Sequence, residues 1–207
     1  MSHTLHRQGS RTDLQDDWVV LAIAAEGINK SGASSRLRRF LELAVRHDAV
    51  NFGDIRTGCS VHFRLEEILA AVEDASVVHA VYTDRSNLAS FLRDLKDEDM
   101  GISVVVSGLF KETRLTLSEA GLTPHTVSLS LGFWGRTERL PRESVLDITT
   151  MCGHGMVPAS LVEALAEDVR RGKIEAGQAA LKLARPCLCG IFNTVRAERL
   201  LRRLAAE

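Results

Sequence analysis

The sequence predicts an α/β protein, in which a mostly parallel, helix-covered sheet is followed by a small all-helical C-terminal module. Apolar runs of strand length alternate with amphipathic stretches from residue 18 to about residue 120. Such repeated strand–helix–strand units are typical of parallel sheets, because parallel neighbours need a long crossover connection. After Pro141 the strand pattern stops and only helical periodicity continues.

The first strand is predicted at 18–24, a continuous apolar run of the kind found in strands buried on both faces. A helix at 34–47 follows, with Leu37, Phe40, Leu41 and Ala44 at helical spacing. Strands at 49–55 and 59–63 are expected to form a hairpin through Thr57 and Gly58. The alternation then gives a helix at 65–75, a strand at 77–82, a helix at 86–97, a strand at 102–107 and a helix at 111–120.

The last predicted strand, at 126–131, alternates polar and apolar residues, so we expect it at an edge with one face in water. The C-terminal part begins with a short helix at 144–151. Ser160 and Glu163 have capping-box spacing and predict the start of a helix that ends at Arg171–Gly172. Another helix covers 175–185, and Asn193 is the expected N-cap of the last one.

These elements divide the chain into three parts. Residues 1–16 lack apolar periodicity and are expected to form a flexible N-terminal arm. Residues 17–140 form the α/β domain, and residues 141–207 form a helical module that contains most of the cysteines.

The composition excludes several classes of protein. Hydrophobic residues make up 45% of the 207 residues and the formal net charge is -1, which argues against a disordered chain and against broad electrostatic binding of nucleic acid or membrane surfaces. No apolar run approaches the ~20 residues that a bilayer span needs. The polar start lacks a signal-peptide core, so a cytoplasmic location is expected. Reduced cysteines there favour metal or thiol chemistry over disulfides.

Three of the four cysteines lie in the C-terminal part, in Cys152-Gly-His154-Gly and Cys187-Leu-Cys189-Gly. The two helices between these segments are each about 11 residues, or ~16 Å, long. A tight turn at Gly172 makes them antiparallel, so the chain returns to its starting end. We therefore expect Cys152 and His154 to face Cys187 and Cys189.

Two metal sites fit this pattern. Cys152, His154, Cys187 and Cys189 make a Cys₃His set that can close a tetrahedral zinc site. Alternatively, the cysteines hold three irons of a [4Fe–4S] cluster, with the fourth iron left to His154, solvent or substrate. The long gap between one cysteine and a close pair favours the cluster. In other interpretations these are packing residues or a dithiol redox pair. Cys59 and His79 are expected to be buried core residues.

A second candidate is a site for a small anionic ligand at the carboxyl ends of the predicted parallel strands. The segments there combine glycine with hydroxyl and cationic residues, which can hold an anion beside a helix N-terminus. The first is not a P-loop, because Ala33–Ser34 stands where Lys-Ser/Thr is required. The candidate residues are Gly27, Asn29, Lys30, Ser31, Trp134 and Arg136.

The leading functional hypothesis is a cytoplasmic protein that binds a [4Fe–4S] cluster or another thiolate-ligated metal. Such a centre can serve a redox or Lewis-acid enzyme acting on a small anionic substrate. One alternative is a structural zinc protein whose sheet domain binds a protein partner or a second copy. Another is a metal-free α/β ligand-binding protein. No residue pattern assigns a catalytic group.

Overall fold

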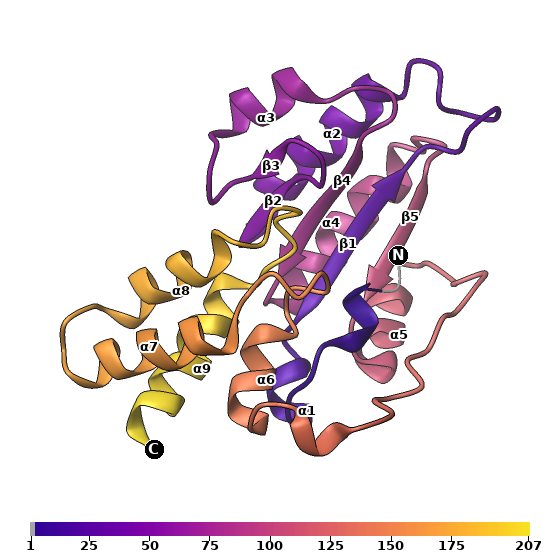
Figure 1. Ribbon diagram of the computed structural model, residues 1–207. Coiled ribbons are helices and arrows are strands. Elements are labelled where there is room, and N and C mark those ends of the chain that lie inside the picture. Colours follow the sequence, from indigo (N-terminus) through magenta and orange to yellow (C-terminus); the bar gives the residue numbers. More distant parts are fainter. Residues whose placement is uncertain (1–2) are drawn as a thin grey trace.

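The computed structural model describes residues 3–207 and places one sheet between two layers of helices (Figure 1). Within these residues the sheet has five strands in the order β3-β2-β4-β1-β5. The two central strands, β4 and β1, carry the most continuous apolar runs. The strands are β1 (Trp18–Ile23), β2 (Asn51–Asp54), β3 (Gly58–Cys59), β4 (Val77–Tyr82) and β5 (Ser103–Ser107).

The prediction of a mostly parallel sheet is wrong, because neighbouring strands pair antiparallel. β1 runs antiparallel to both β4 and β5, so that Leu21 lies opposite His79 on one side and Val105 on the other. β2 is likewise antiparallel to β3 and β4. The helical crossovers do join strands of the same direction, but β4 lies between β1 and β2, and β1 lies between β4 and β5. Hydrophobic periodicity reports which residues are buried and not which strand lies alongside.

The helices between strands cover one face of the sheet and the C-terminal helices cover the other. On β1, Val20 and Ala22 share a core with the first group of helices, whereas Val19 and Leu21 share a core with the second. This explains why the whole of β1 is apolar. The first group is α2 (Ala33–Arg46), α3 (Leu65–Ala71), α4 (Arg85–Asp97) and α5 (Phe110–Glu119); the second is α6 (Glu143–Thr149), α7 (Ala159–Arg170), α8 (Ala176–Ala184) and α9 (Thr194–Ala206).

Part of the predicted N-terminal arm contacts the C-terminal part of the chain: Arg7 donates to the carbonyl of Ile191, and the backbone N–H of Gln8 donates to the hydroxyl of Thr150. Residues 1 and 2 lie outside the described residues. It contains η1 (His3–His6) and α1 (Arg11–Leu14). Asp17, the residue directly after the arm, binds Arg7 and, at 3.0 Å, Arg196 of α9, and both the Asp17 and the Arg196 side chains are fully buried. These ion pairs fix the arm to the C-terminal helix, and their sequence separation hides them from local pattern analysis.

Residues 126–131 form no strand. They belong to a long irregular segment that passes outside α5 towards α6 (Figure 1), with short helix η2 (Thr137–Arg139) near its end. Val127, Leu129 and Leu131 are 52, 65 and 86% exposed. The alternating pattern of residues 126–131 matched a half-buried strand, but a strand also needs a paired neighbour, which the pattern does not reveal.

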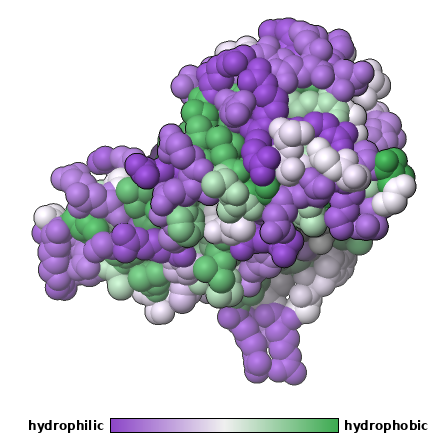
Figure 2. All heavy atoms as spheres, turned by 90° about the horizontal axis from the view of Figure 1, so that it is seen from above, coloured by the Kyte–Doolittle hydropathy of each residue, from purple (hydrophilic) through white to green (hydrophobic). Residues whose placement is uncertain are grey.

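Hydrophilic residues dominate the face of the molecule shown in Figure 2, with hydrophobic patches between them.

Two predicted helix starts have different outcomes. Asn193 does cap α9, because its side chain accepts a hydrogen bond from the backbone N–H of Arg196. The capping box at Ser160 is wrong, since α7 begins at Ala159 directly after Pro158. Proline is favoured near helix starts because it has no N–H to leave unpaired.

Candidate functional site

Three cysteines meet where the helical hairpin of α7 and α8 returns to its starting end. Gly172 allows the reversal with a φ of 68°. Cys152 precedes α7, and Cys187 and Cys189 follow α8. The Sγ atoms of Cys187 and Cys189 lie 3.6 Å apart, and the Cys152 thiol is hydrogen-bonded to Cys187. All three are buried free thiols, so the two loops form one cluster of sulfur atoms.

Hydrogen bonds in this thiol cluster favour negative charge on two of its sulfurs. The pKa of Cys152 and that of Cys189 are both lowered, first because Cys187 hydrogen-bonds to each, although burial opposes the effect. Backbone N–H groups assist, and the His154 side chain hydrogen-bonds to Cys189. The pKa of Cys187 is raised by its hydrogen bonds to Cys152 and Cys189 and by burial. The hydrogen bonds thus shift the pKa of Cys187 in the opposite direction from the pKa values of Cys152 and Cys189.

His154 lies at the surface side of the thiol cluster. Its side chain is exposed, whereas Cys152, Cys187 and Cys189 are at most 4% exposed. All four predicted metal residues are thus in one neighbourhood. As the side chains stand, however, no group of three or more His, Cys, Asp or Glu residues within residues 3–207 is arranged so that it could hold a metal ion.

Asn51 fixes the loop that contains Cys187 and Cys189 and extends to Phe192 (the cysteine loop) to the sheet. Asn51 was not identified as a functional residue from the sequence. Its fully buried side chain donates to the carbonyl oxygens of Gly190, at 2.6 Å, and Phe192, at 3.0 Å. The Ser60 hydroxyl donates to the Asn51 carbonyl oxygen at 2.7 Å. An asparagine at the start of an otherwise buried strand was the available signal, because a buried amide requires partners.

Replacing Asn51 with leucine is expected to lower the free energy of unfolding by about 1–3 kcal/mol, because the carbonyls of Gly190 and Phe192 lose their buried donor. Urea unfolding measures this change, and faster reaction of the cysteines with a thiol reagent measures release of the loop. Asn87→Leu is the control, since the amide of Asn87 makes an exposed contact with Asp48. Equal thiol reactivity in the two variants would contradict the positioning role.

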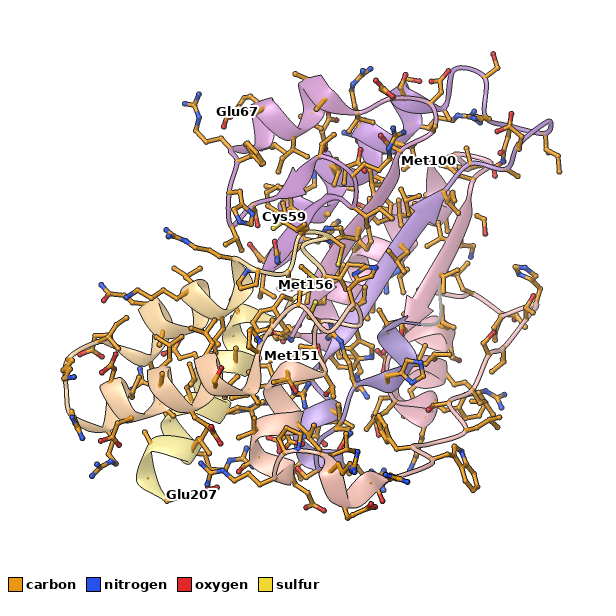
Figure 3. All side chains as sticks on the ribbon, viewed as in Figure 1. Cys59, Glu67, Met100, Met151, Met156 and Glu207 are labelled. Atoms are coloured by element: carbon orange, nitrogen blue, oxygen red, sulfur yellow. The ribbon has the colours of Figure 1, made fainter. Side chains whose placement is uncertain are left out.

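The fourth cysteine approaches the same loop from the sheet side. Cys59, at the end of β3, is fully buried, as expected, and its Sγ lies 3.8 Å from His62 Nδ1. In Figure 3 Cys59 lies at the edge of the hairpin that faces the C-terminal helices. His79, on β4, is also fully buried, as expected. Gly190 lies directly against both residues, because a Cβ added there would lie 2.2 Å from the Cβ of Cys59 and 3.1 Å from Nε2 of His79, so the cysteine loop packs against the sheet.

The six predicted anion-binding residues do not form one site. Because the sheet is antiparallel, the end of β1 lies beside the starts of β4 and β5. The loop after β1 carries Gly27, Asn29, Lys30 and Ser31 at that edge, whereas Trp134 and Arg136 lie on the long segment outside α5 (Figure 1).

Several of these side chains have local partners. Asn29 accepts from the backbone N–H of Ala25 and donates to the carbonyl of Gly101, which closes the loop. Lys30 pairs with Glu26 at 2.5 Å. The 85% exposed Trp134 donates its indole N–H to the carbonyl of Leu131. Asn29, Lys30 and Trp134 thus have partners within or beside their own loops, and anion binding stays a prediction.

Comparison with known proteins gives no assignment: no family model, no curated protein and no solved structure matches the chain. In the described part of the chain, no helix has the length and apolar character needed to cross a membrane.

Proposed function

We propose that this protein binds a single thiophilic metal ion, such as zinc, through Cys152, Cys187 and Cys189. One observation carries the proposal: three buried thiols from two loops, more than 30 residues apart in the chain, meet within hydrogen-bonding distance. Buried cysteines used only for packing need not converge. The fourth ligand position is left to His154, as the sequence predicts, or to another group.

The spacing of the sulfurs favours a single ion over the [4Fe–4S] cluster that the sequence favours. Two thiolates at ~2.3 Å from one tetrahedral zinc ion lie about 3.8 Å apart. The Sγ atoms of Cys187 and Cys189 are 3.6 Å apart. In a [4Fe–4S] cluster each thiolate binds a different iron, so the sulfurs stand farther apart. Small rotations of the thiols about χ1 are enough to bring the observed sulfur arrangement to the geometry of a single-ion site. Larger changes are needed to reach the geometry of a [4Fe–4S] cluster.

The electrostatics of the cluster also supports a cation. Cys152 and Cys189 favour the thiolate form, yet the charge on Cys152 raises the pKa of Cys189, so two negative sulfurs repel each other. A divalent ion removes this repulsion. Its binding replaces the hydrogen bonds between thiols with metal–sulfur bonds and releases the thiol protons to solvent.

Metal analysis tests the proposal. Protein prepared under reducing, anaerobic conditions is expected to contain one zinc-type ion per chain, and Cys152→Ser and Cys189→Ser are expected to lose it. Met151→Leu is the matched control, because it removes a buried sulfur next to Cys152 without removing a thiolate. Wild-type protein that binds no metal would overturn the proposal. Iron with an equal amount of sulfide would overturn the single-ion form of it and favour the cluster.

A further inference from the structure

We propose that Cys59 supplies the fourth ligand, so that the ion occupies a closed site of four thiolates joining the β2–β3 hairpin to the C-terminal helices. This inference rests on the proposed function, and it assigns to Cys59 the ligand position predicted from the sequence for His154. Every cysteine of the chain then belongs to one site, although the four come from three segments far apart in the sequence.

The close approach of Cys59 to Gly190 is the main geometric argument. Gly190 directly follows Cys189, and a Cβ added at Gly190 would lie 2.2 Å from the Cβ and 2.7 Å from the Sγ of Cys59. Only a glycine permits this approach. The thiol of Cys59 thus lies against the backbone of the loop that carries Cys187 and Cys189.

The hairpin itself is built so that Cys59 can reach this position. Cys59 pairs with Gly53 of β2. A Cβ at Gly53 would lie 2.3 Å from the carbonyl oxygen of Gly58 and 2.6 Å from the Cα of Cys59. Because Gly53 has no side chain, β3 packs closely onto β2. Asn51, on the same strand as Gly53, holds the cysteine loop through its hydrogen bonds to the carbonyls of Gly190 and Phe192.

Formation of this site involves no redox step. One divalent ion and four thiols give a tetrathiolate complex of charge −2 and release four protons to solvent, with no electron transferred.

Cys59 suits the fourth position better than His154 does. Cys59 is fully buried, whereas the His154 side chain is exposed and hydrogen-bonds to Cys189. In this arrangement His154 orients the Cys189 thiolate, as groups next to the ligands commonly do. Closed sets of four protein ligands are typical of structural zinc sites, whereas catalytic sites keep an open position. The ion then holds two layers of the fold together.

Cobalt substitution distinguishes the two candidates for the fourth ligand. Sulfur-to-cobalt charge-transfer absorbance rises with the number of bound thiolates. Cobalt-loaded Cys59→Ser is expected to lose the part of this absorbance that one of the four thiolates contributes. We also expect it to bind the ion more than about 100-fold more weakly, a larger loss than is usual for mutating a group next to the ligands. His154→Asn is expected to keep the wild-type absorbance, with affinity reduced at most about 10–100-fold.

The remaining outcomes are also decisive. X-ray absorption of the zinc-loaded wild-type protein is expected to give four sulfur neighbours, and it needs no variant that has to fold. Three sulfurs and one nitrogen, with unchanged absorbance in Cys59→Ser, would overturn the role of Cys59 while leaving the three-cysteine site intact. Wild-type protein that binds neither cobalt nor zinc would overturn the proposed function and this inference together.

Discussion

Replacing Asp17 with alanine is expected to lower the free energy of unfolding by about 3–5 kcal/mol, the usual cost of removing one partner from a buried ion pair. The Asp17 carboxylate binds Arg7, Arg196 and the side-chain amide of Asn193, which donates at 2.9 Å. Without Asp17, the fully buried guanidinium of Arg196 loses its ion-pair partner. Urea unfolding followed by circular dichroism measures the change. Because Arg7 belongs to the N-terminal arm, the variant is also expected to expose that arm to protease.

Glu167→Ala is the control for this prediction. Glu167 pairs with Arg170 and Arg171 on the exposed side of α7, where ion pairs commonly contribute nothing measurable. We therefore expect no detectable change in the unfolding midpoint. Equal effects of Asp17→Ala and Glu167→Ala would contradict the buried character of the Asp17 network.

The same network predicts a pH dependence. Burial by itself raises the pKa of Asp17, but Arg7, Arg196 and Asn193 lower it further than burial raises it, so the pKa lies below its ordinary value. The resulting stabilisation is complete above the unfolded pKa of about 3.9 and is lost as the pH falls through the folded value. The difference in unfolding free energy between wild type and Asp17→Asn is therefore expected to be constant near neutral pH and to shrink below about pH 4. A difference that grows on acidification would contradict this sign.

Sequence patterns predicted the elements of the fold better than their pairing. The apolar runs gave the positions of β1 and β4, and the helical spacing of Leu37 and Phe40 gave α2, because burial leaves a period in the sequence. The order of strands leaves no such period. The ordinary assumption that a helical crossover joins neighbouring strands fails here, because an antiparallel strand is inserted into each crossover unit.

The candidate site was predictable where it depends on local geometry. The lengths of α7 and α8 and the turn at Gly172 suffice to predict that the loop of Cys152 meets the loop of Cys187. The contact of Asn51 with Gly190 joins residues 139 positions apart and leaves no periodic trace. Cys59 is similar: its pattern correctly predicted burial but not the loop against which it is buried.

Gly190→Ala is expected to have the second large effect, a loss of about 2–5 kcal/mol of unfolding free energy. Two costs add: ~1–2 kcal/mol for a side chain in the left-handed region, where Gly190 has a φ of 71°, and about 1–3 kcal/mol for overpacking. The overpacking arises because the added Cβ would lie 2.2 Å from the Cβ of Cys59 and 3.1 Å from Nε2 of His79. Metal affinity is expected to fall as well, since the hairpin must move away from the cysteine loop.

Gly172→Ala separates the two costs. Gly172 has nearly the same φ, 68°, but an added Cβ there would meet nothing within 4 Å. We therefore expect it to lose only the ~1–2 kcal/mol of backbone strain and to keep wild-type metal affinity. The clash also predicts that Gly190→Ala costs less in a Cys59→Gly background, a coupling that a double-mutant cycle by urea unfolding measures. Equal losses for the two glycine variants, or additive effects in the cycle, would contradict the packing of Cys59 against the cysteine loop.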